Sequence, residues 1–309
     1  MINTAVQARD SIAIQALRRE IYAKPAVSRA DLSMLLRAGG DSPAEYARLL
    51  ADVATDLLVN QADPPKYVDQ TAADWLIAEI GASKVAYGPE IHMLTEVIRL
   101  AVSVPSSLAD FCVAEIEKAI VEGREGHPAG EVAVEDTQAL RVAIFAAVDG
   151  SSLHVSRADA ESLFRIAHAT KNAANAPEFD GFFARAVGNY LMGIAFRWTP
   201  SPAEELEKDK WLDGQPVNFS QFLAAAFCGR PSGALRLETV DDADEQRQRE
   251  ENAADAREMA TALQIDGGET DWLLAHLSRP GALTSAERAL LTFLRREAPS
   301  LPERLAALA

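Results

Sequence analysis

The chain has few of the features that mark disulfide-bonded, β-sheet or membrane proteins. It contains two cysteines, Cys112 and Cys228, both in apolar surroundings and without the spacing of a metal motif. Aromatic residues make up 6% of its 309 residues, and the alternating β-branched runs typical of strands do not occur. No stretch approaches the roughly 18 apolar residues that a membrane-spanning helix needs, and no basic leader precedes an apolar run. These absences predict a helical, cytoplasmic protein with no membrane partner.

Basic residues are also few, with 30 Lys and Arg against 46 Asp and Glu, and the formal net charge is −16. Nucleic acids and anionic membrane surfaces are bound through basic patches, and the lysines and arginines of this chain do not cluster. The charge balance therefore argues against a nucleic-acid partner. Apolar residues make up 48% of the chain, which is sufficient for a substantial buried core at this length.

The short motifs of common enzyme chemistries are missing as well. No HExxH, CxxC, GxSxG, GxGxxG or Walker-type sequence occurs, and no two of the five histidines share the spacing of a metal motif. We therefore predict a protein that has no recognisable catalytic apparatus and uses no cofactor.

What the chain does contain is an internal repeat. Residues 74–108 and 271–305 align without a gap at a constant offset of 197, and 12 of the 35 aligned positions are identical. Self-similarity of this kind is the sequence signature of a duplicated structural unit. Ala and Leu dominate the composition, so the repeated unit is predicted to be all-α.

Two shorter matches extend the repeat towards the N-terminus. QALRREIY at 15–22 matches QALRVAIF at 138–145, and VSRAD occurs at both 27–31 and 155–159. An apolar stripe at helical spacing also recurs. Its first copy is Tyr46, Leu49, Leu50, Val53, Leu57 and Leu58, and its second is Phe179, Phe182, Phe183, Ala186, Tyr190 and Leu191.

We therefore predict two pseudo-equivalent helical halves, residues 1–123 and 134–309, joined by a Gly-rich linker near 123–133. The symmetry breaks once, because the connector at 60–70 of the first half corresponds to an insertion at 194–266 of the second. This insertion is far longer than an ordinary loop.

Capping boxes mark many of the predicted helix starts. In this arrangement a short polar side chain at the N-cap accepts the N3 amide, and an N3 acid returns a bond to the N-cap amide. The pattern occurs at Ser28-x-x-Asp31, Ser156-x-x-Asp159, Asn175-x-x-Glu178, Thr284-x-x-Glu287 and Ser300-x-x-Glu303. The predicted helices span 9–23, 29–38, 43–59, 71–80, 89–102, 106–122, 135–147, 157–170, 177–193, 267–277, 285–297 and 302–308.

Acidic residues at equivalent positions of the two copies are candidate metal ligands. These are Asp69 with Asp266, Asp74 with Asp271, and Glu90 with Glu287. They could converge on a divalent cation if the two copies face each other. The simpler interpretation is that they cap helices and lie near the positive ends of helix dipoles. The stretch at 281–287 resembles the second half of an EF-hand loop, but a proline and an imidazole stand where Ca²⁺ needs oxygen ligands.

The insertion at 194–266 is the predicted working surface, with Trp198 and Trp211 as its candidate binding residues. Ordering an added segment costs about 1–2 kcal/mol of backbone entropy per residue, which burial or binding must offset. Two interpretations stay open, namely that the insertion binds a partner or that it covers an apolar face of its own chain.

The segments VSRADAESLF at 155–164 and EFDGFFARAVGNYLMG at 178–193 resemble uncharacterised, mainly alphaproteobacterial, tandem helical proteins, which have no established activity. The Asp149-Gly150 and Asp266-Gly267 helix entries and the tandem helices are similar to the tellurite-resistance TerB-like family. That resemblance implies an acidic metal site around Asp149 and Asp266.

Together these features predict a non-enzymatic interaction or scaffold protein of the cytoplasm, whose partner is another protein. The alternative is a divalent-metal-binding, TerB-like stress or sensor protein.

Overall fold

The structure is a computed structural model. It describes residues 11–38, 43–83, 87–124, 126–148, 155–192, 265–278, 282–298 and 300–308. Within these residues the chain is helical, with isolated β-bridges and no strand. The predicted all-α fold class is therefore confirmed.

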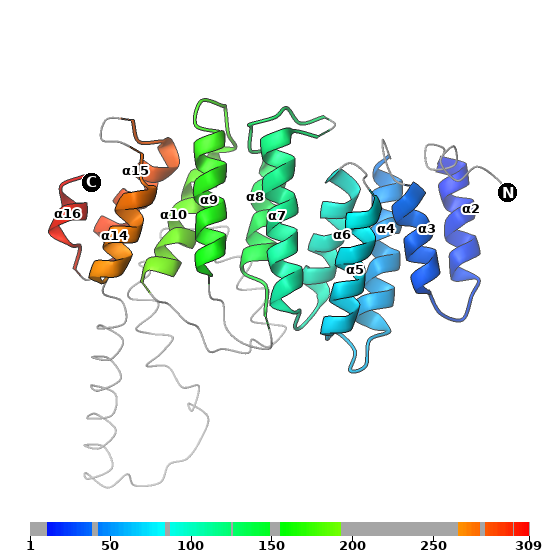
Figure 1. Cartoon of the computed structure of the whole chain (residues 1–309). Helices are drawn as coiled ribbons and strands as arrows, with labels where there is room; N and C mark the ends of the chain where they lie inside the picture. The colour runs from blue at the N-terminus through cyan, green and yellow to red at the C-terminus, as the bar shows by residue number, and fades with distance from the viewer. Residues whose placement is uncertain are drawn as a thin grey trace, which may run out of the picture. The chain divides into compact units, whose positions relative to one another are not determined.

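The helices follow the predicted order along the chain (Figure 1). The first half contains α2 (Ser11–Tyr22), α3 (Arg29–Ala38), α4 (Ala44–Thr55), the π-helical segment η1 (Asp56–Asn60), α5 (Gln70–Ser83), α6 (Tyr87–Leu100) and α7 (Ser106–Glu122). The second half contains α8 (Val134–Ile144), α9 (Arg157–Ala169), α10 (Pro177–Leu191), α14 (Gly267–His276), α15 (Ser285–Glu297) and α16 (Glu303–Ala306).

The described residues form two compact units, the first ending at Phe183 and the second beginning at Ala184. This division lies within α10 and does not coincide with the predicted linker at 123–133. There, α7 packs against both α8 and α9 inside the first unit. The duplication itself stays a prediction.

The helices of the first unit alternate between two layers. In one layer α2 packs on α4, α4 on α6, and α6 on α8; in the other α3 packs on α5, α5 on α7, and α7 on α9. Contacts between α3 and α4, α6 and α7, and α7 and α8 join the layers. From α2 to α9 the successive helices of this unit stand side by side (Figure 1). Such stacking of adjacent helices buries a continuous core.

The core follows the predicted apolar stripes. Tyr46, Leu49 and Val53 of α4 are fully buried, as are Phe179 and Phe183 of α10. The Tyr46 hydroxyl donates to the carbonyl oxygen of Leu35 at 2.6 Å, so its polar atom is satisfied inside the core. The free cysteine Cys112 is buried in α7, as its apolar surroundings predicted. Cys228 lies outside the described residues.

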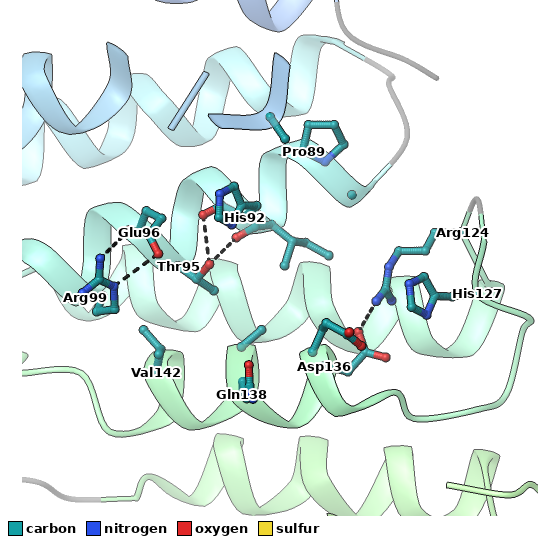
Figure 2. A pocket seen from close by; sticks show the side chains of 15 residues that line it. Pro89, His92, Thr95, Glu96, Arg99, Arg124, His127, Asp136, Gln138 and Val142 are labelled. Atoms are coloured by element: carbon teal, nitrogen blue, oxygen red, sulfur yellow. Dashed lines mark hydrogen bonds and ion pairs between the residues drawn. The ribbon is translucent and has the colours of Figure 1, made fainter. Parts of the chain in front are cut away.

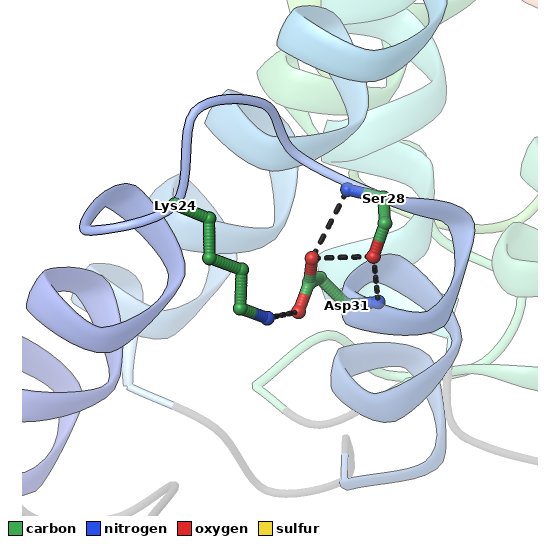
Figure 3. Close-up of polar contacts among 3 residues, drawn as sticks. All are labelled: Lys24, Ser28 and Asp31. Atoms are coloured by element: carbon green, nitrogen blue, oxygen red, sulfur yellow. Dashed lines mark hydrogen bonds and ion pairs between the residues drawn. The ribbon is translucent and has the colours of Figure 1, made fainter.

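Three of the predicted capping boxes are confirmed, those starting at Ser28, Ser156 and Thr284. At the start of α3, the backbone N–H of Ser28 donates to Asp31 Oδ2 at 3.0 Å, and the Asp31 N–H reaches Ser28 Oγ at 3.4 Å. At α9 the corresponding bonds between Ser156 and Asp159 measure 3.0 and 3.1 Å. The Asp31 carboxylate also accepts a bond from Lys24, which comes from the preceding turn (Figure 3).

Two predicted boxes are wrong. The Asn175 side chain does not cap α10, because its Oδ1 accepts the N–H of Val132 at 3.0 Å and its Nδ2 donates to Thr170. Ser300 does not cap α16, whose N-cap is Pro302 without a side-chain bond. The causes differ. Tertiary contacts occupy the Asn175 side chain, and α16 begins at Glu303, later than the Ser300 spacing requires. Sequence spacing shows neither.

The second unit packs the end of α10 with α14, α15 and α16. Gly188 of α10 leaves room for the Phe293 ring, since a Cβ placed on Gly188 would lie 2.4 Å from Phe293 Cε1. The rings of Tyr190 and Trp272 meet edge to face with centroids 4.8 Å apart. Aromatic packing therefore fills the space between α10 and the helices α14 and α15.

None of the described helices combines the length and apolar character needed to cross a bilayer.

Candidate functional site

One face of the first unit contains two cavities that meet on α6. The first cavity, of about 550 Å³, lies between α6 and α8 and is also lined by the loop after α7. The second, of about 620 Å³, lies between α2, α4 and α6. His92 and Glu96 line both cavities. We call the two cavities together the α6 groove.

Two ion pairs line the cavity between α6 and α8, one within α6 and one between the loop after α7 and α8 (Figure 2). Arg99 donates from Nε and Nη2 to the two carboxylate oxygens of Glu96, at 3.2 and 2.6 Å. Arg124 Nη2 lies 2.6 Å from Asp136 Oδ1, and the Asp136 side chain is only 2% exposed. Because its second oxygen accepts the Ala133 N–H at 2.9 Å, Asp136 ties the loop to the first turn of α8.

Two histidines contribute to the same cavity from different elements. His92 comes from α6 and is exposed, and His127 comes from the loop after α7 and is half-buried. The Thr95 hydroxyl donates to the carbonyl oxygens of Ile91 and His92, both at 2.9 Å, so it is occupied within its own helix. Together with the Gln138 amide of α8, the two imidazoles give this cavity side chains that can both donate and accept hydrogen bonds.

The wall between α2 and α4 depends on η1. A π-helical turn widens the backbone locally and is frequent at functional sites. Asp56, at the start of η1, accepts a bond from the Tyr22 hydroxyl and another from Asn60 Nδ2, both at 2.6 Å. Burial and the contact with Asp56 raise the pKa of Tyr22, which therefore stays a hydrogen-bond donor. One turn earlier, Asp52 pairs with Arg18 at 2.5 Å.

The groove carries a small excess of acid. Five acidic residues line it, Asp52, Asp56, Glu96, Glu135 and Asp136, against four arginines, Arg18, Arg48, Arg99 and Arg124. Three of the arginines form ion pairs with three of these acids. The two remaining acids are Asp56, whose bonds come from neutral donors, and the exposed Glu135.

The predicted acidic ligands of the first unit have separate roles. Asp69 caps α5 by accepting the Ala72 N–H at 2.7 Å, and Asp74 accepts a bond from Gln70 at 2.6 Å. Glu90 faces the core of the unit and is 4% exposed.

Those of the second unit are engaged in local contacts. Asp266 forms a capping box with Glu269 at the start of α14, with bonds of 2.7 and 2.8 Å. Asp271 pairs with Arg304 of α16 at 2.5 Å. Glu287 completes the capping box of α15.

Among the described residues, no group of three or more His, Cys, Asp or Glu side chains is placed to hold one metal ion. The helix-capping interpretation therefore accounts for Asp69, Asp266 and Glu287. Trp198, Trp211 and Asp149 lie outside the described residues.

Glu90 and Glu287 align in the repeat, but their environments differ. Glu287 Oε1 accepts the Ser278 N–H at 2.7 Å, and its Oε2 accepts the Thr284 N–H at 2.6 Å. In the part of the chain that the structure describes, neither Glu90 oxygen has a hydrogen-bond partner. Burial raises the pKa of Glu90 to about 7, and the charge of Glu115 adds to this shift.

Sequence reasoning did not find the groove, although part of its signal was present. Asp52, Asp56 and Asn60 recur at intervals of four on the predicted 43–59 helix and just beyond it, and His92 and Glu96 do so on the next helix of the same layer. Residues at this spacing share one helix face. What the sequence could not show is that these polar faces belong to helices that stack in one layer.

No protein-family model matches the chain, and no curated protein or solved structure is similar to it.

Proposed function

We propose that the protein is a non-enzymatic, cytoplasmic interaction protein whose first unit binds a segment of another protein in the α6 groove. The observation that carries this proposal is the meeting of two cavities at His92 and Glu96 on one face of stacked helices. Stacked helical layers commonly offer extended surfaces of this kind to partners.

The chemistry of the groove favours binding over bond cleavage. Its arginines Arg18, Arg99 and Arg124 are held by carboxylates. Ion pairs of this kind fix the shape of a wall and present mixed polar and apolar surface, as protein interfaces do.

The charge of the groove favours a basic partner segment. Outside the three ion pairs the groove has Asp56 and Glu135 against one arginine, Arg48, so it keeps a net excess of one acid, and the whole chain carries −16. A field of this sign attracts positively charged segments and accelerates their association, more strongly at low salt. We therefore propose that the segment carries Lys or Arg side chains.

A pair of charge-matched double variants tests this proposal. Asp56→Asn with Glu135→Gln removes the two groove acids that lie outside the ion pairs. Glu45→Gln with Asp110→Asn removes two exposed acids that line neither cavity. A partner captured with the intact chain is purified, and its affinity for each variant is measured at two salt concentrations.

We expect the groove variant to bind at least tenfold more weakly and with a smaller salt dependence, and the control variant to bind like the original chain. Equal affinities of the two double variants would contradict the proposal.

The insertion at 194–266, with Trp198 and Trp211, is proposed as a second contact surface. Replacing it with the eleven-residue connector at 60–70 tests this part separately. Loss of binding in the shortened chain, with full binding by the groove variant, would move the site from the groove to the insertion.

Metal analysis of protein purified without chelator tests the alternative TerB-like function. Stoichiometric bound metal would contradict the interaction proposal as stated and would favour the metal-binding sensor.

A further inference from the structure

The first turn of α6 places an acid inside the protein directly behind the groove wall. Glu90 is 4% exposed, and neither of its carboxylate oxygens has a hydrogen-bond partner within the described residues. An unpartnered carboxylate in such a place is costly, whereas the protonated carboxyl is tolerated far better.

Apart from the backbone N–H of Glu90 itself, which lowers the pKa less than burial raises it, the groups that face Glu90 do not favour its charge. Tyr46 of α4 is fully buried, and its hydroxyl is already bonded to the Leu35 carbonyl oxygen. Glu115 of α7 adds negative charge, which also acts on the buried Cys112 thiol. Among the described side chains of α8 and η1, none shifts the pKa of Glu90.

The same turn forms part of the groove. Gly88, Pro89, Ile91 and His92, the immediate neighbours of Glu90, line the cavity between α6 and α8. Glu90 points into the core while these neighbours form the wall, so a movement of one side of this turn moves the other.

We propose that Glu90 is a proton switch for the first turn of α6. The protonated side chain packs in the core and holds the groove wall as described. The ionised side chain moves towards water and displaces the wall. This inference rests on the proposed function for its role in binding, but the switch itself is a property of the free protein.

The direction of the switch follows from the pKa of Glu90, which is about 7 in the folded chain against 4.5 for an ordinary glutamate. The packed form therefore predominates below about pH 7, and opening becomes easier as the pH rises through this value. His92 and His127 line the cavity on the other side of the wall, so the experiment needs a reference that keeps them.

Hydrogen exchange of the full-length chain, with and without Glu90→Gln, gives that reference. The amide variant keeps the neutral shape and both histidines but cannot ionise. At each pH the exchange rate of α6 amides is divided by the rate in the variant, which cancels the intrinsic pH dependence. We expect this ratio to grow on the order of 50-fold between pH 5 and pH 8, and the same ratio for α9 to stay near one.

Two outcomes would overturn the proposal. A ratio that does not change with pH would show that Glu90 does not control the turn. Faster exchange of Glu90→Gln than of the original chain at pH 8 would show that the carboxylate accepts stabilising bonds, as Glu287 does. If Glu90→Gln fails to fold, Glu90→Met serves as the non-ionising reference, and α9 of the original chain gives an internal one.

No partner is present in this experiment. A negative result would therefore remove the switch and leave the groove-binding test unaffected. A negative binding test would likewise leave the switch in place.

Discussion

Helices α6 and α15 occupy the same place in the sequence repeat, but the hydrogen bonding of their buried glutamates differs. Glu287 caps its helix with two backbone bonds, while Glu90 has no hydrogen-bond partner among the described residues. The helix starts differ at the aligned position. Thr284 is the N-cap of α15 and its hydroxyl accepts the Glu287 N–H at 3.1 Å, whereas the aligned Tyr87 is already the first residue of α6.

A second pair of aligned positions shows a related contrast. In the second unit, Gly188 of α10 leaves room for the Phe293 ring. In the first unit the aligned residues are Thr55 and Glu96, and both line a cavity. One substitution pair therefore separates a filled core from an open groove. A shared apolar stripe thus fixes helix packing, whereas single positions decide where a surface stays hollow.

The largest predicted effect is that of replacing Glu287, whose two carboxylate oxygens accept backbone hydrogen bonds. Glu287→Gln replaces one acceptor oxygen with an amide that faces a backbone N–H. Losing charge-assisted bonds in a fully buried place should lower the free energy of unfolding by about 3–5 kcal/mol. Chemical unfolding at pH 7 measures this change. A loss below 1 kcal/mol would mean that the capping box contributes little.

Glu90→Gln should have the opposite sign. The folded-state pKa of about 7 is raised above the ordinary 4.5, so the stability of the original chain falls as the pH rises from about 4.5 to about 7. The variant lacks this loss and should be more stable by up to about 3 kcal/mol above pH 7. Near pH 4.5 the two chains should unfold alike. Unfolding curves across this range check both the sign and the window.

Gly188→Ala should overpack the contact between α10 and α15. The added methyl group meets the buried Phe293 ring, and overpacking of this kind costs about 1–3 kcal/mol. Gly81→Ala is the matched control, because a Cβ there meets nothing within 4 Å in a helix. Thermal unfolding should show a destabilised first variant and a control that is unchanged or slightly stabilised. Equal effects would contradict the packing argument.

The smallest predicted effect concerns the repeated VSRAD helix starts. Burial raises the pKa of Asp31, but the bonds from Lys24 and Ser28 outweigh it, and the net shift is downward. Lys24→Met removes one of these bonds and should cost about 0.5–1 kcal/mol at neutral pH, because Lys24 is half exposed. The loss should shrink as the pH falls through the pKa of Asp31. The exposed Lys171→Met provides the control.

Much of the fold followed from local sequence signals. The predicted helix at 106–122 matches α7 residue for residue, and the capping boxes at Ser28, Ser156 and Thr284 are present. These features depend on residues three or four positions apart, which a sequence shows directly. The predicted 43–59 helix changes to π-helical geometry at Asp56, and sequence spacing gives no sign of that change.

The candidate site was less predictable, because it depends on distant neighbours. Asn175 bonds to Val132, 43 residues away, instead of capping its own helix. Glu90 and Glu287 align in the sequence repeat, which makes them equivalent candidates for metal ligands. Their difference appears only when the residues around each carboxylate are in place.

The protonation of Glu90 is the centre of this account, and a carbon NMR titration of the full-length chain tests it most directly. Glutamate side chains are labelled at the carboxyl carbon, and the Glu90 resonance is the one that Glu90→Gln lacks. We expect a titration midpoint of about 7 for this resonance. A midpoint at or below the ordinary value of 4.5 would show a carboxylate stabilised in its charged form and would contradict the account.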